Sequence, residues 1–223
     1  MTHHTVNLHD RGLWAIALSL WACGPTQALT LDDFESGVSE LAVPGVPVPP
    51  NGAVDLLTPA LVPGGTRSLG FIADPQSTGL VFMSVSRGDL QAYAAPSQPL
   101  SMSFGYGGSA PMNLDLSALD FLRLDMIWAA AQIGAGFDTN ALEMTIYATT
   151  SNGIGLNPDG SAMHTRLKGG VVMDIPFASF GINAVTGGGV NWADVDGLLF
   201  VVSEVKPMAR GFAGFGIRSI EVL

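Results

Sequence analysis

Short apolar runs separated by Gly- and Pro-rich turns make up most of the chain. The run from Leu119 to Trp128 alternates apolar and polar residues, which is the period of a half-buried β-strand. A strict period of two places Trp128 on the same face as Leu124 and Met126. The following segment, Ala129 to Ala135, has helical propensity, but its neighbouring glycines limit a helix to a turn or two. The pattern predicts a protein built of strands.

Two apolar runs near the C-terminus suggest how these strands pack. Val171 to Ile175 and Leu198 to Val202 have strand length, and Pro176 ends the first because it has no N–H for a ladder. We expect the second run to be fully buried, which requires a sheet on each side. The sequence therefore predicts an all-β fold, a two-sheet antiparallel sandwich of about 10–12 strands that forms one domain over residues 29–223.

The segments between these strands predict one surface loop and one tight turn. Residues 43–52 are rich in proline and are expected to form an extended surface loop. Arg87 and Gly88 lie between two expected strands, and this position is typical of a two-residue hairpin turn. Together with Asp89 they also form the sequence of an adhesion tripeptide, Arg-Gly-Asp.

Large apolar side chains on the inward positions of these strands predict the core. Acidic residues surround Phe34 and are expected to point away from it, as solvated residues at a strand end. We expect seven residues to be buried together where the first and last strands meet: Phe34, Phe177, Phe180, Trp192, Leu198, Phe200 and Ile217.

The N-terminal 28 residues have the pattern of a signal peptide. Leu13 to Ala22 is a ten-residue apolar stretch, too short to span a membrane, and Thr26-Gln27-Ala28 offers small residues for cleavage after Ala28. An alternative is lipoprotein processing, in which Cys23 is lipidated and anchors the chain. Either route predicts an exported protein, periplasmic or extracellular, that does not span the membrane.

Charge and composition narrow the class of function. The net charge of −10 disfavours nucleic acid as a partner. After residue 28 the chain has no cysteine and one histidine, His164, so it lacks the usual nucleophile–base and zinc-ligand sets. Asp194 and Asp196 are available as a pair of carboxylates, but they are typical of turn chemistry.

Aromatic side chains are the candidate ligand-binding residues, because rings stack on the faces of sugars. Tyr106 lies between two glycines, Tyr147 lies among the polar positions of its strand, and Trp128 ends a strand. Trp192 precedes a buried strand and is expected to belong to the core.

Three segments resemble the galactose-binding-like β-jelly-roll domain of bacterial carbohydrate-binding modules and related exported bacterial proteins. They are the opening strand at residues 31–37, the segment at residues 175–198 that is similar to a penultimate hairpin, and the closing strand at residues 215–222. The resemblance implies a structural calcium ion, with Glu35 as a ligand. Arg218 stands where the family has an Asp ligand, so it is expected to pair with Glu35 or Asp33 in place of the ion.

Together these features predict a non-catalytic exported module that binds carbohydrate or has a structural or adhesive role at the cell envelope or extracellular matrix. Its expected partners are a glycan or another envelope protein. The alternative is a polysaccharide-acting enzyme, a hydrolase or lyase, on the same scaffold, with no cofactor beyond the possible calcium.

Overall fold

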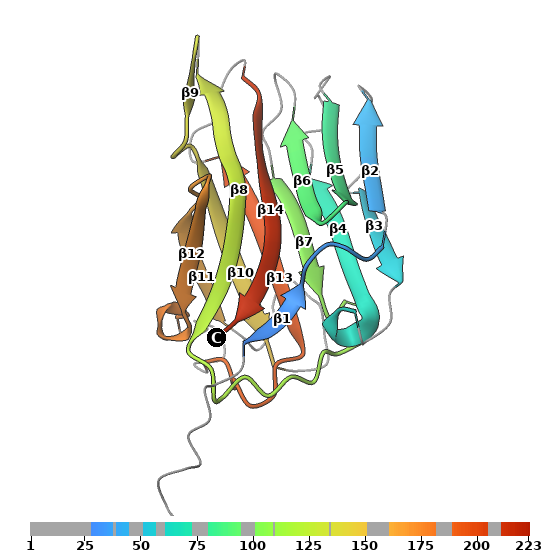
Figure 1. Ribbon diagram of the computed structural model, residues 1–223, viewed down its shortest axis with the longest axis vertical. Coiled ribbons are helices and arrows are strands. Elements are labelled where there is room, and N and C mark those ends of the chain that lie inside the picture. Colours follow the sequence, from blue (N-terminus) through green and yellow to red (C-terminus); the bar gives the residue numbers. More distant parts are fainter. Residues whose placement is uncertain are drawn as a thin grey trace, which may run out of the picture.

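The chain folds into two antiparallel β-sheets packed face to face (Figure 1). A computed structural model describes residues 28–37, 39–44, 51–56, 61–72, 80–94, 101–108, 110–133, 135–150, 161–181, 189–204 and 211–223. Within these ranges it contains fourteen strands and two short 3-10 turns, Pro63–Gly65 and Phe177–Ser179, and no α-helix. The predicted all-β sandwich is therefore confirmed, with more strands than expected.

The eight-stranded sheet, called sheet A, has the order β12-β8-β14-β6-β5-β2, with β1 paired to β14 and β9 paired to β8. In Figure 1 it is the front layer, with β8 and β14 side by side. Its strands are β1 (Leu29–Asp32), β2 (Ser39–Pro44), β5 (Leu80–Ser86), β6 (Asp89–Ala94), β8 (Phe121–Ile133), β9 (Gly136–Asp138), β12 (Val171–Pro176) and β14 (Ala213–Val222).

The six-stranded sheet, called sheet B, has the order β11-β10-β13-β7-β4-β3. Its strands are β3 (Asn51–Leu56), β4 (Thr66–Ile72), β7 (Ser101–Tyr106), β10 (Leu142–Thr149), β11 (Ser161–Arg166) and β13 (Gly197–Glu204). Its central strand, β13, pairs with both β10 and β7.

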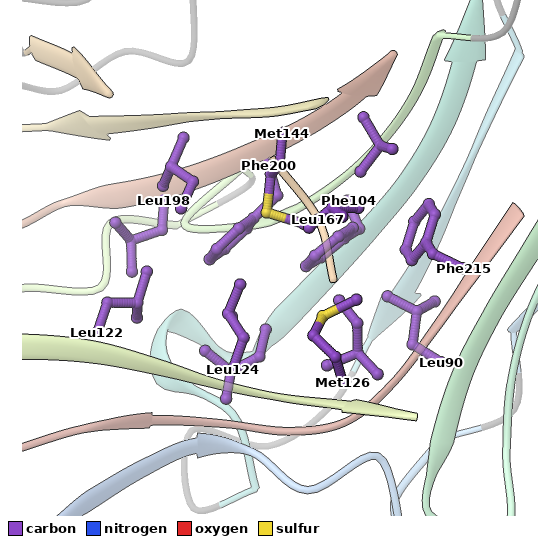
Figure 2. Packing of buried hydrophobic residues seen from close by; sticks show 14 of the residues in the cluster. Leu90, Phe104, Leu122, Leu124, Met126, Met144, Leu167, Leu198, Phe200 and Phe215 are labelled. Carbon is purple, nitrogen blue, oxygen red and sulfur yellow. The ribbon is translucent and has the colours of Figure 1, made fainter. Parts of the chain in front are cut away.

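The inner faces of the two sheets form one apolar core (Figure 2). Phe104 and Phe200 stack there with ring centroids 4.6 Å apart and planes within 3°. Five of the seven predicted core residues are buried. The other two, Phe180 and Trp192, are partly buried and pack against the core, with Trp192 stacked on Phe177 at 3.8 Å. The predicted core is therefore confirmed at five of its seven positions.

The two apolar runs near the C-terminus lie in different sheets, which corrects the expected hairpin between them. β12 is the edge strand of sheet A, where Val171 is 42% and Val172 55% exposed. β13 is central in sheet B, but its side chains alternate between buried and half-buried instead of all being buried. An apolar run of this length does not distinguish an edge strand from a central one.

One local prediction is wrong, and another is wrong at its bounds. β8 continues to Ile133, so most of the segment expected to be helical is strand. The ends of the expected 43–52 loop belong to β2 and β3, and residues 45–50 lie outside the described residues. In both cases pairing with neighbouring strands overrides local propensity.

The predicted signal peptide, including Cys23, lies almost entirely outside the described residues. No helix among the described residues is long and apolar enough to cross a membrane.

The hairpin turn at Arg87 and Gly88 is confirmed. Both residues have positive φ angles, 55° and 79°, and they join β5 to β6. A two-residue turn fixes the register of the hairpin. That register places Phe82 opposite Tyr93.

Candidate functional site

Two β-bulges lie side by side in β8 and β14. Gly216 pairs with Trp128, the next pair is Ile217 with Met126, and the one after is Ser219 with Asp125. The first step skips a residue of β8 and the second skips Arg218 of β14, so the second bulge restores the register. Bulges re-aim side chains and are common beside functional sites.

The bulge in β8 turns Trp128 to the outer face of sheet A. Met126 and Ala129 both point into the core, so the two residues between them lie outward. This corrects the face expected for Trp128, which a strict period of two places with Leu124 and Met126.

Two glycines of β14 allow the indole of Trp128 to lie flat on the sheet. A Cβ atom at Gly214 would lie 2.5 Å from Cη2 of Trp128, and one at Gly216 would lie 2.6 Å from its Nε1. Real Cβ atoms do not approach other atoms so closely, so larger residues at these positions would lift the ring. One face of the indole therefore covers the backbone of β14.

Three more rings continue from Trp128 across the outer face. Phe212, just before β14, lies with its centroid 6.0 Å from that of Trp128, and the planes differ by 17°. Tyr93 follows at 5.7 Å from Phe212, and Phe82 stacks on Tyr93 at 4.9 Å. All four are half-buried, so each is partly exposed to solvent. We call Phe82, Tyr93, Trp128 and Phe212 the aromatic surface.

A polar side chain borders the aromatic surface. Gln91 of β6 accepts a hydrogen bond from Nε1 of Trp128 at 3.4 Å. It lies on the same outward face as Tyr93, two residues along the strand. An amide beside exposed rings can donate to or accept from hydroxyl groups of a ligand.

Two ion pairs occupy the same face of sheet A beyond the aromatic surface. Arg123 holds both oxygens of Asp174, through Nε at 2.7 Å and Nη2 at 2.9 Å. This hydrogen bonding raises the pKa of Arg123 and lowers that of Asp174. Arg218 donates from Nη1 to Asp125 at 2.9 Å, which corrects its expected pairing with Glu35 or Asp33.

The three predicted ligand-binding residues lie in three different places. Trp128 is on the outer face of sheet A. Tyr147 is half-buried and points outward from sheet B, since its neighbours Ile146 and Ala148 face the core. Tyr106 is 2% exposed and lies in the core, so its ring has no free face for a sugar.

Tyr106 belongs instead to a buried polar cluster that joins the two sheets. Its hydroxyl donates to Oδ2 of Asp32 at 2.8 Å. Arg67 binds the same carboxylate through Nε at 2.7 Å and Nη2 at 2.9 Å, and Nη2 also donates to the carbonyl of Ser36 at 3.0 Å. Asp32 and Arg67 are 1% and 0% exposed. The expectation that Asp32 is a solvated strand-end residue is therefore wrong.

The cluster fixes the end of β1. Asp32 also accepts from the backbone N–H of Phe34 at 2.8 Å, and Phe34 has a positive φ of 57°, an uncommon conformation for a bulky residue. The Arg67 guanidinium lies 5.3 Å from the centroid of the Phe34 ring. Burial raises the pKa of Tyr106 well above its ordinary value, and the Asp32 carboxylate raises it further.

Glu35, the expected calcium ligand, is exposed and lies against Gly88 of the β5–β6 turn. Within the part of the chain that the structure describes, no three His, Cys, Asp or Glu side chains are close enough together to hold a metal ion. The calcium expected at Glu35 stays a prediction.

Among the described residues, the groups around His164 do not have the arrangement of a catalytic triad. Oγ1 of Thr145 lies 2.8 Å from Nδ1 of His164, and Oε1 of Glu143 lies 3.7 Å from the same nitrogen. In a catalytic triad the nucleophile and the acid contact opposite ring nitrogens. Asp196 belongs to the other candidate pair of carboxylates, with Asp194. Burial raises the pKa of Asp196, and Asp194 raises it further. Asp196 is only 7% exposed, so little of it is open to a substrate.

Four residues of this face were not among the predicted site residues: Phe82, Tyr93, Phe212 and Gln91. The predicted hairpin turn already implied that Phe82 and Tyr93 pair across β5 and β6. The two glycines in the last strand, Gly214 and Gly216, were the available indication that a large ring lies over β14. The place of Phe212 depends on tertiary structure, and no local pattern indicates it.

Comparisons with known proteins identify a distant likeness. No family model matches the sequence, and no curated protein sequence matches it. The structure is similar to a family 11 carbohydrate-binding module from Clostridium thermocellum in complex with a β-1,3-1,4-mixed-linked tetrasaccharide, with 13% identity, a TM-score of 0.42, and 88% of this chain and 95% of that chain covered. It is also similar to part of an agarase, with 9% identity, a TM-score of 0.33, and 87% of this chain but 24% of that chain covered.

Proposed function

We propose that this protein binds carbohydrate on the aromatic surface of sheet A, without a catalytic role. The observation that carries the proposal is the row of four partly exposed rings, in which Trp128 lies flat over two glycines of β14. Rings held in this way present apolar faces to the C–H groups of a sugar, and an already ordered site loses little side-chain entropy on binding. Gln91 supplies an amide at the border.

The two bulges support a functional role for this surface. A regular ladder between β8 and β14 would place Trp128 in the core and would not need compensating bulges. The fold loses regular ladder pairing at both positions and gains a partly exposed indole, as expected where a side chain is re-aimed for binding.

Native electrophoresis in gels that contain soluble polysaccharides tests the proposal. We expect at least one uncharged polymer, such as hydroxyethyl cellulose, xylan or galactan, to retard the wild-type protein. Trp128→Ala should abolish this retardation. Tyr147→Ala, an aromatic truncation on the outer face of the other sheet, is the matched control and should bind like wild type.

Two results would contradict this function. Unchanged retardation of Trp128→Ala would show that the ligand binds elsewhere. Release of reducing sugar from the same polymers by the wild-type protein would support the alternative, a polysaccharide-acting enzyme.

We further propose that the chain is exported and that the mature protein begins at Leu29. The support is the ten-residue apolar stretch followed by Thr26-Gln27-Ala28. The intact mass of the exported protein should correspond to residues 29–223. A diacylated species that begins at Cys23 would contradict this and would make the protein a lipoprotein.

A further inference from the structure

The bulge in β14 places a cation beside the aromatic surface. Ile217 and Ile220 both point into the core, so the two residues between them are displaced from the inner face, and the Arg218 side chain is 60% exposed. Its one hydrogen bond among the described residues runs from Nη1 to Asp125, whose side chain is 27% exposed. A guanidinium has five N–H donors, so most of those of Arg218 face solvent.

Arg218 and Asp125 follow closely on Trp128 along β14 and β8. Nε1 of Trp128 lies over Gly216, and Arg218 is two residues farther along β14. Two residues of a regular strand span about 7 Å, so one ligand can reach both the indole and the ion pair. A sugar stacked on Trp128 would therefore have its next unit, or its own hydroxyl groups, over the Arg218–Asp125 pair.

We propose that the Arg218–Asp125 pair is a specificity-determining subsite that binds neighbouring hydroxyl groups of an uncharged polysaccharide stacked on Trp128. This inference rests on the proposed function of the aromatic surface. The guanidinium donates to one ligand oxygen while the free lone pairs of the carboxylate accept from an adjacent hydroxyl. A donor and an acceptor held side by side match two neighbouring hydroxyl groups.

The charges around the subsite disfavour an acidic polysaccharide. Asp125 already neutralises Arg218, and Glu221 lies farther along the same strand near Arg123. The whole chain carries a net charge of −10, which repels polyanions at long range. These negative charges do not repel an uncharged ligand.

A second ion pair on the same face provides a control. Arg123 already binds both oxygens of Asp174, and its side chain is 35% exposed. It lies farther along β8 from Trp128 than Asp125 does. Arg123→Met therefore removes an arginine from the same sheet face without touching the proposed subsite.

The experiment compares polymers that differ in charge. Dissociation constants of hydroxyethyl cellulose and carboxymethyl cellulose, and of methyl-esterified and de-esterified polygalacturonate, are measured at 150 mM salt for the full domain. We expect wild type to bind the uncharged member of a pair more tightly. Arg218→Met and Asp125→Asn should each weaken that binding about tenfold, and Arg123→Met should leave it unchanged. Asp125→Asn should also shift the preference toward the anionic member, since it leaves the charge of Arg218 unpaired.

The outcomes separate this inference from the proposed function. If Trp128→Ala abolishes binding but Arg218→Met and Asp125→Asn bind like wild type, the subsite is wrong and the function stands. Tighter binding of the anionic member by wild type would overturn the assigned ligand class. If Trp128→Ala binds like wild type, or no uncharged polymer binds at all, both proposals fail.

Discussion

At the scale of single residues, the buried cluster of Asp32, Arg67 and Tyr106 differs most from an ordinary sandwich core. A buried ion pair is not in itself a source of stability, because desolvation opposes the attraction, but loss of one partner leaves a charge without compensation. Here the carboxylate comes from β1 in sheet A, while the guanidinium and the phenol come from β4 and β7 in sheet B. The cluster therefore ties the first strand to the opposite sheet in one register.

Tyr106→Phe is predicted to destabilise the fold. It removes a hydrogen bond to a buried carboxylate, which is typically worth about 1.5–3 kcal/mol. The effect should also depend on pH. Because the pKa of Tyr106 is raised in the folded state, the stability due to the neutral phenol is present below the unfolded pKa of about 10 and is lost as pH rises above it. Denaturant unfolding from pH 8 to 11 should show a steeper fall for wild type than for Tyr106→Phe.

Parallel curves for the two proteins would show that Tyr106 ionises as readily in the folded state as in the unfolded chain. This would contradict its burial against Asp32. The burial of Tyr106 corrects the expectation from sequence that it is a ligand-binding residue.

At the scale of elements, the pairing of β8 with β14 decides where the candidate site lies. The alternating pattern of residues 119–128 predicted the strand correctly but placed Trp128 on the wrong face. A bulge inserts one residue without changing local composition, so a count of alternating positions cannot detect it. The second bulge likewise leaves Arg218 out of the ladder, which no count of alternating positions indicates. The fold class followed from many strands together, whereas the site depends on single-residue shifts between two of them.

Gly216→Val is predicted to abolish carbohydrate binding while the protein stays folded. The new side chain would collide with Nε1 of Trp128 and displace the indole from β14. A displaced indole is more exposed to water, so we expect the tryptophan emission to shift to the red. This shift and the loss of gel retardation should appear together. Gly189→Ala is the control, because a Cβ atom there meets nothing within 4 Å. Normal binding by a folded Gly216→Val protein would mean that the flat position of Trp128 is not required.

At the scale of the whole molecule, one core supports both sheets, and the aromatic surface depends on its rigidity. Sheet A carries the site on its outer face, while its inner face packs against Phe104, Phe200 and their neighbours from sheet B (Figure 2). Phe215 of β14 lies 6.2 Å from Phe104, centroid to centroid. Loss of core packing below β14 should therefore disturb the outer face as well.

Phe200→Ala is predicted to leave little folded protein. Phe200 is fully buried, stacks on Phe104 and lies nearly perpendicular to the Tyr106 ring, with centroids 6.4 Å apart. Truncation of a buried Phe typically costs about 3–5 kcal/mol, a large share of the roughly 5–15 kcal/mol that stabilises a domain. Val201→Ala, a half-buried position next to it on the outer face of β13, should cost much less. Thermal melts of both variants decide the matter: a Phe200→Ala protein that melts within a degree or two of wild type would mean that β13 does not present Phe200 to the core.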